Sequence, residues 1–149
     1  MNREVIFRGK RLDNGKWLYG DLMHDNHQGC YIYPNDCTGL YTENKVDPDT
    51  VGEFTGMRDR HGKKVFEGDV IRRRDSAFGY VDTGVVKYDF HLGAFVLEYE
   101  SYGRTYQSTF KKGFSDNDGK CTIEGTYSYE VIGNIHNNPE FVNKDDNNC

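Results

Sequence analysis

Four residues near the N-terminus have the side chains that zinc prefers. They form the pattern H-x2-H-x2-C-x6-C and are His24, His27, Cys30 and Cys37. Imidazole and thiolate groups make mixed tetrahedral zinc sites in proteins. This spacing is drawn out, however, and Cys30 opens a run, with Tyr31, Ile32 and Tyr33, that is typical of a strand. We therefore favour a solvated loop with a half-buried thiol, keep zinc as an alternative, and expect no cofactor.

A second group of side chains could bind phosphate. Residues 56–74 include seven basic residues against three acidic ones, and the aromatic residues Phe66, Phe78 and Tyr80 lie close by in the sequence. Basic side chains beside aromatic rings suit a nucleic acid, since they contact its phosphates and stack on its bases. Solvated or self-paired surface charges explain the same pattern, and such pairs contribute little stability. The residues that this hypothesis assigns to nucleic-acid contact are Arg58, Lys63, Lys64, Arg72, Arg73 and Arg74.

Motifs of known enzymes are not found. The sequence has no G-x-S-x-G, P-loop or G-x-G-x-x-G pattern, and no Ser or Cys nucleophile has a base near it in the sequence. Glu67 and Asp69 flank a glycine at the start of a predicted strand, where we expect side chain-to-backbone hydrogen bonds rather than an acid–base pair. The segment 116–119, DNDG, places Phe114 and Gly125 where a calcium loop needs carboxylates, so we predict a hairpin turn there. We expect no enzymatic activity.

The composition is that of a β-rich protein. Of 149 residues, 36% are apolar and 14% aromatic, with 11 Tyr and 9 Phe, which suit strands with one packed and one wet face. The net charge of −5 argues against a dedicated nucleic-acid coat but not against a local basic patch. Residues 1–7 do not resemble a signal peptide, so we expect reduced cysteines in the cytoplasm. No apolar run approaches the ~20 residues of a membrane span.

Short strands joined by turns account for most of the chain. In residues 16–22, Leu18 and Leu22 alternate with Trp17, Tyr19 and Asp21, which is the period of a strand. Any helix should be short, because Pro and Gly interrupt the sequence often. The ranges predicted to be strands or extended are 5–7, 17–23, 30–33, 64–66, 70–74, 84–88, 94–100, 105–110 and 129–135.

Glycines are expected where the chain needs a positive φ or where a side chain would obstruct packing. The positions are 9, 15, 20, 56, 62, 68 and 84. Residues 65–138 are expected to form one compact barrel of antiparallel strands, with residues 1–55 as a smaller β lobe packed on it. Residues 142–149 are polar, and we expect a disordered tail.

Several short sequence pieces resemble the YopX-like proteins of phages and prophages. Each piece is weak alone, but their order and spacing are specific, and the similarity extends from Phe7 to about Phe141. The resemblance implies a mainly β protein with a small SH3-like antiparallel barrel in its second half. It implies no catalytic residues. The pieces are FRGK at 7–10, NGKW at 14–17, TVG at 50–52, TGM at 55–57, EGDV at 67–70, GVV at 84–86 and VIGNI at 131–135.

Three hypotheses about function follow. We favour a non-enzymatic accessory protein encoded by a phage or prophage, whose β module binds a phage or host protein in the bacterial cytoplasm. The alternatives are a nucleic-acid-binding module that uses residues 56–74, and a zinc-binding protein. We also expect a homo-oligomer, since small antiparallel barrels leave strand edges that a second copy can cover.

Overall fold

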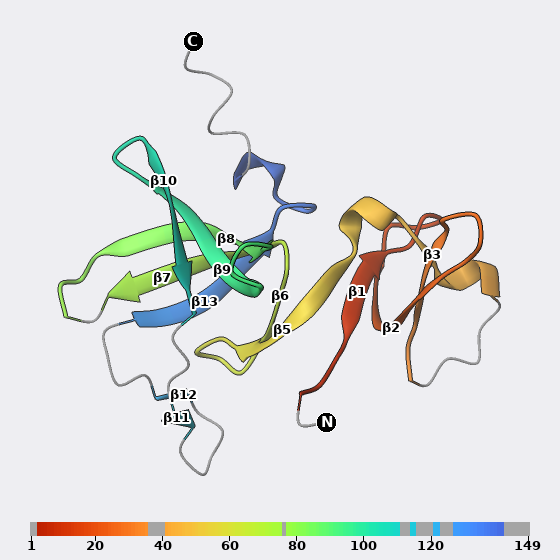
Figure 1. The fold of residues 1–149 in the computed structure, drawn as a ribbon, viewed down its shortest axis with the longest axis horizontal. Helices are drawn as coiled ribbons and strands as arrows, with labels where there is room; N and C mark the ends of the chain where they lie inside the picture. Colours follow the sequence, from red (N-terminus) through yellow and green to blue (C-terminus); the bar gives the residue numbers. More distant parts are fainter. Residues whose placement is uncertain are drawn as a thin grey trace. The chain divides into compact units, whose positions relative to one another are not determined.

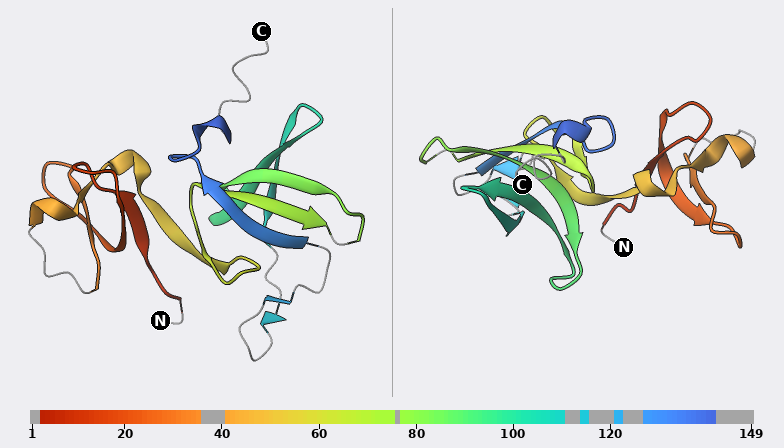
Figure 2. Two further views of the ribbon diagram at one scale, coloured as in Figure 1. Left: turned by 180° about the vertical axis from the view of Figure 1, so that it is seen from behind. Right: turned by 90° about the horizontal axis from the view of Figure 1, so that it is seen from above.

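The computed structural model describes residues 3–35, 41–75, 77–110, 114–115, 121–122 and 127–141. The chain divides into two compact units, Met1–Gly56 and Met57–Cys149, and strands dominate both (Figures 1 and 2). The helices among the described residues are three short 3-10 turns: η1 (Tyr41–Asn44), η2 (Pro48–Thr50) and η3 (Pro139–Phe141). The expectation of a mainly β protein with little helix is therefore confirmed. None of these described helices has the length or apolarity needed to cross a membrane.

The first unit is built on an antiparallel sheet. Its strands are β1 (Phe7–Lys10), β2 (Trp17–His24), β3 (Cys30–Tyr33), β4 (Lys45–Val46) and β5 (Gly52–Arg58), in the order β4-β3-β2-β1-β5, and β6 (Lys64–Phe66) continues the sheet beside β5. Leu18 and Leu22 pack against the buried cluster of Cys30, Ile32 and Val46, while Tyr19 on the other face is exposed. The alternation of apolar residues along β2 thus predicted its buried face correctly.

A hairpin leads from β5 to β6 (Lys64–Phe66), and a second antiparallel sheet follows. It consists of β7 (Asp69–Asp75), β8 (Val81–Asp89), β9 (Ala94–Ser101), β10 (Arg104–Thr109) and β13 (Tyr127–Asn134), in the order β10-β9-β8-β7-β13. The short strands β11 (Phe114–Ser115) and β12 (Cys121–Thr122) pair only with each other among the described strands. The core of this unit contains Val65, Ile71, Val86, Leu97 and Tyr129.

In the second sheet, the strand that comes last in the sequence pairs with the one that comes first. β13 pairs with β7 from Tyr127 opposite Asp75 to Asn134 opposite Asp69, with an irregularity between Val131 and Gly133. Among the described strands, β10 and β13 remain the two edges. The described strands therefore do not form a closed barrel. The expected antiparallel β fold is confirmed, and the expected SH3-like barrel is not.

Glycines occupy the kinds of position that the sequence indicated. Gly62 has a φ of +80° in an open loop, whereas a Cβ on Gly84 would lie 2.6 Å from the carbonyl oxygen of Glu98. Gly84 therefore lets β8 and β9 approach more closely than any side chain would permit. The other predicted positions also show either a positive φ or a close approach: Gly9, Gly15, Gly20, Gly56 and Gly68.

Most predicted strands are present, and their ends differ by a few residues. The largest difference is the strand Gly52–Arg58, which sequence analysis did not assign. Its glycines at 52 and 56 weaken the strand pattern, but its pairing with β1 supplies the missing stabilisation. The predicted turn at 116–119 and the predicted tail at 142–149 lie outside the described residues.

Candidate functional site

A groove of about 520 Å3 lies on the second sheet, over the face of β8 opposite the core. This volume falls within the range of protein sites that hold small molecules or parts of peptides. Thr83, Val85 and Lys87 alternate along β8 and line the groove, while the intervening Val86 is fully buried in the core. The groove therefore lies on the face of the sheet to which every second side chain of β8 points.

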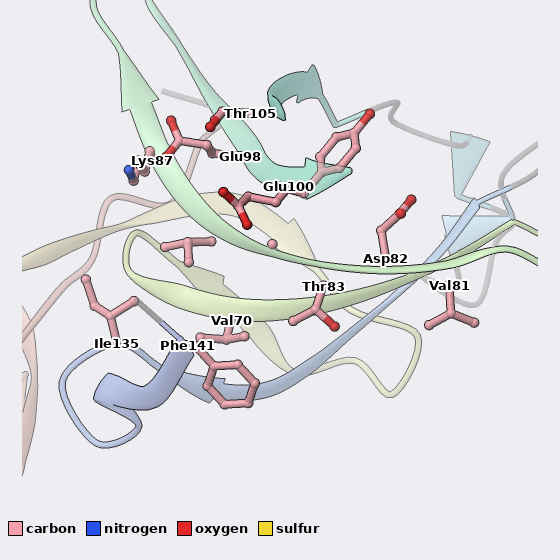
Figure 3. A pocket seen from close by; sticks show the side chains of 13 residues that line it. Val70, Val81, Asp82, Thr83, Lys87, Glu98, Glu100, Thr105, Ile135 and Phe141 are labelled. Atoms are coloured by element: carbon pink, nitrogen blue, oxygen red, sulfur yellow. Dashed lines mark hydrogen bonds and ion pairs between the residues drawn. The ribbon is translucent and has the colours of Figure 1, made fainter. Parts of the chain in front are cut away.

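One side of the groove is acidic. Glu98 and Glu100, which alternate along β9, lie beside Thr105 of β10 (Figure 3). Lys87 forms an ion pair with Glu98, and the amide of Gln107 donates a hydrogen bond to the other oxygen of that carboxylate at 3.2 Å. The carboxylate of Glu98 is therefore held on the sheet surface by Lys87 and Gln107.

The other side of the groove is apolar. Ile135 and Phe141, which follow β13, lie there beside Val70 of β7, whose side chain is fully buried (Figure 3). An apolar wall that faces a pair of carboxylates suits a ligand with an aliphatic or aromatic group next to a positive charge. The described residues contain no group of three or more His, Cys, Asp or Glu side chains that could hold a metal ion.

The three consecutive arginines of β7 have different environments. Arg72 and Arg74 are exposed, while Arg73 on the opposite face is only 6% exposed. The guanidinium of Arg73 lies 4.2 Å from the ring centre of Tyr99 and 4.7 Å from that of Tyr127. Of the predicted contact residues, Arg73 is therefore part of the folded interior.

The remaining predicted contact residues come from the β5–β6 hairpin. Arg58 and Lys63 are exposed and Lys64 is partly buried. Arg58 donates a hydrogen bond to the carbonyl oxygen of Gly62 at 2.9 Å, across the hairpin. In Figure 1 the loop of this hairpin passes beside β13, within the second unit.

A buried carboxylate fixes that loop. Asp59 accepts hydrogen bonds from the backbone N–H groups of His61 at 2.8 Å, Lys63 at 2.9 Å and Val131 at 3.0 Å. Arg60 adds a backbone hydrogen bond to the carbonyl oxygen of Tyr129 at 2.9 Å. These bonds cover the outer edge of β13 and place the basic loop beside that strand.

The β5–β6 loop and β7 both contact Glu130. Its carboxylate lies 3.4 Å from the imidazole of His61 and 3.6 Å from the guanidinium of Arg72. Of the predicted contact residues, Arg72 is thus the one linked to the loop by a described ion pair.

Three of the zinc-type residues can be located. His24 and His27 are exposed, and Cys30, which pairs with His24 across β2 and β3, is only 6% exposed. Burial raises the pKa of the Cys30 thiol, with a smaller contribution from the nearby carboxylate of Asp25. A raised pKa disfavours the thiolate that zinc requires. Cys37, the fourth residue of the pattern, lies outside the described residues.

Comparison with known families gives one match over nearly the whole chain: the model described as YopX protein matches residues 6–143. The chain belongs to the YopX family. A solved structure of a protein from Enterococcus faecalis, EF1440, is similar with 18% sequence identity, a TM-score of 0.47, and coverage of 95% of this chain and 99% of that one. No curated protein matches the chain.

Several sequence pieces that resemble the YopX family have structural roles in this chain. Asp69 of the EGDV piece is 2% exposed and accepts a hydrogen bond from the N–H of Phe66 at 2.8 Å. This confirms the expected side chain-to-backbone bond at that corner. Gly84 of the GVV piece permits the close approach of β8 and β9. Asp69 and Gly84 thus have structural roles in this member of the YopX family.

Sequence analysis did not identify the groove residues. They come from four strands and the last turn, and only the pairing of the strands brings them together. The one local signal is the alternation of Thr83, Val85 and Lys87, which indicates a strand with a polar outer face but not what lies opposite it.

Proposed function

We propose that this protein is a non-enzymatic module that binds a segment of another protein in the groove over β8. The observation that carries the proposal is the division of the groove into a side with Glu98 and Glu100 and an apolar side with Ile135 and Phe141. Its ligand is an extended peptide in which a Lys or Arg lies next to a large apolar residue. Shape and charge together select such a segment.

We also propose that the second unit has an SH3-like fold. The strand order β13-β7-β8-β9-β10 is compatible with a small SH3-like barrel, because the last strand lies beside the first. Family membership and resemblance to phage and prophage proteins support an accessory role in a bacterial host cell, where the ligand is a phage or host protein. No chemical step is part of this function.

Selection from a library of displayed random peptides tests the proposal. We expect the wild-type protein to enrich peptides with a basic residue beside an apolar one. Thr105→Trp, which places a large ring at the edge of the groove, should abolish this enrichment. Thr109→Trp is the matched control, since Thr109 is exposed on the same strand but does not line the groove. Peptides without a shared pattern, or equal binding by both variants, would exclude the groove as the binding site.

We further propose that the protein self-associates through β10. Five of its six residues are exposed, and it is an edge of the sheet among the described strands. Exposed edges pair readily with a second chain, and a lysine on the edge opposes such pairing. Analytical ultracentrifugation should show an oligomer for the wild-type protein and a shift towards monomer for Thr109→Lys. A wild-type monomer at all concentrations would contradict self-association.

A further inference from the structure

Exposed basic side chains lie on the β5–β6 loop and on β7, the two segments that flank β13. We call this set of residues the basic edge. Glu130 of β13 contacts two of them, His61 and Arg72. The carboxylate of Asp59 is used by backbone N–H groups below the surface. The residues of the basic edge are Arg58, Arg60, His61, Lys63, Arg72 and Arg74.

The spacing of the two arginines on β7 suits a chain of phosphates. Arg72 and Arg74 are two positions apart on one strand face, roughly 6.7 Å along the strand. This distance is comparable to that between successive phosphates in an extended single strand of DNA or RNA. Arg72 is 45% exposed at its side chain, so its guanidinium is accessible to a ligand.

Exposed aromatic rings lie at the end of the same hairpin. Phe78 and Tyr80, in the turn between β7 and β8, are 76% and 68% exposed, and their ring centres are 6.3 Å apart. Asp75 fixes this turn, since its carboxylate accepts hydrogen bonds from the N–H groups of Ala77 and Phe78. Arg74 pairs with Val81 immediately beside the turn, and the N–H of Asp75 donates a hydrogen bond to the carbonyl oxygen of Tyr80 at 2.8 Å. The two rings therefore lie at the end of the hairpin that carries the arginines.

We propose that the basic edge and these two rings bind single-stranded nucleic acid. Arg72, Arg74 and the loop residues Arg60 and Lys63 contact the phosphates, while unpaired bases stack on Phe78 and Tyr80. The rings favour a single strand over a duplex, because bases within a duplex are already stacked. The rings also favour a nucleic acid over an acidic peptide, because binding of an acidic peptide would require only the basic side chains.

This surface borders one side of the groove, since Arg74 pairs with Val81, which lines the groove. Arg72 pairs with Thr83, which lines the groove, whereas Thr105 is separated from β7 by β8 and β9. The Thr105→Trp variant therefore blocks the groove without reaching the basic edge. Retained nucleic-acid binding by this variant separates the two functions experimentally.

Fluorescence anisotropy tests the proposal, with labelled oligothymidylate and oligouridylate of about 16 nucleotides and a duplex of equal length. At about 50 mM salt we expect saturable binding of the single strands, weaker by tenfold or more at about 200 mM. Arg72→Gln/Arg74→Gln should weaken binding and reduce the slope of log K against log salt by about 1.4. Phe78→Ser/Tyr80→Ser should weaken single-strand binding at least about fivefold and remove the preference over duplex.

The control for charge is Lys16→Gln/Lys45→Gln, which changes the net charge equally at exposed positions of the first unit. It should bind as the wild-type protein does. Absence of saturable binding at low salt would overturn the proposal. So would equal weakening in the control, which would indicate attraction by net charge alone. Competition by polyglutamate as effective as that by oligonucleotide would assign the surface to an acidic peptide instead.

Discussion

Arg73 and Asp82 form an ion pair between β7 and β8, on the core face of the second sheet. The guanidinium donates through Nη2 to Oδ2 of Asp82 at 2.7 Å and through Nη1 to Oγ of Ser108 at 3.1 Å. Burial alone would lower the pKa of Arg73, but hydrogen bonds to Asp82 and Tyr99 outweigh it and raise the pKa. The middle arginine of the triplet therefore stabilises the fold, while its neighbours remain on the surface.

Loss of one partner of this pair should destabilise the protein more than loss of both. Asp82→Ala leaves a buried guanidinium without its carboxylate, and we expect unfolding free energy to fall by about 2 to 3 kcal/mol. This lies below the value for a fully buried pair, because the Asp82 side chain is 27% exposed. Arg73→Met/Asp82→Ala should recover part of the loss in urea denaturation. Additive effects of the two single substitutions would show that the residues are not coupled.

Removal of the Asp59 carboxylate should release the β5–β6 loop from β13. Asp59→Ala leaves three backbone N–H groups without their acceptor, and we expect a loss of about 3 kcal/mol. Asp59→Asn keeps one oxygen and should lose less. Hydrogen exchange provides the measurement: in Asp59→Ala, the amides of His61, Lys63 and Val131 should exchange much faster. Unchanged protection of Val131 would mean that another group holds the loop.

Two glycines should respond differently to substitution. Gly84→Ala introduces a Cβ against the backbone of β9 and should lower the unfolding free energy by about 2 to 3 kcal/mol. Gly62→Ala meets no atom within 4 Å, and only the left-handed backbone should cost about 1 kcal/mol. Asparagine tolerates that backbone, so Gly62→Asn should be nearly neutral and Gly84→Asn the most harmful. Thermal denaturation of the four variants checks this order.

The turn between β2 and β3 should weaken in acid. Asp25 accepts hydrogen bonds from the N–H groups of Gly29 at 2.7 Å and His27 at 2.9 Å and from the hydroxyl of Tyr31 at 2.9 Å. These bonds, that from Gly29 foremost, hold the pKa of Asp25 below its ordinary value.

A lowered carboxyl pKa stabilises the folded state above the pKa of the unfolded chain, and this contribution is lost as pH falls through the folded-state value. Asp25→Asn should therefore lower stability at neutral pH and flatten its decline in acid. Asp21→Asn, at an exposed position on β2, is the control for the loss of one negative charge. Parallel acid profiles for the wild-type protein and Asp25→Asn would contradict this assignment.

Cys30 should resist alkylation in the native protein. Its burial and raised pKa both reduce the amount of reactive thiolate. Iodoacetamide labelling followed by peptide mass mapping should modify Cys30 only after denaturant is added. If Cys30 instead became reactive on treatment with a chelator alone, a bound metal would be indicated and the zinc alternative would gain support.

Sequence analysis predicted local structure correctly where that structure depends on a single type of residue. Alternation placed Leu18 and Leu22 on the buried face, and glycines marked tight turns and close approaches. Alternation along the predicted strand 70–74 places Arg73 on the face opposite Arg72 and Arg74. It could not show that Arg73 is the buried one, because its partner Asp82 lies on another strand. It also could not find the groove or the role of Asp59, since both depend on residues that are distant in the sequence.

The pairing of β13 with β7 has a consequence for synthesis on the ribosome. β7 to β10 can pair as successive hairpins as they emerge from the ribosome. The free edge of β7 and the carboxylate of Asp59 find their partners only when β13 emerges, since Val131, which donates to Asp59, follows it by 72 residues. During this interval the nascent chain exposes an unpaired strand beside unfilled core positions, a state prone to intermolecular pairing. Among the described strands, this sheet is therefore complete only once β13 has left the ribosome.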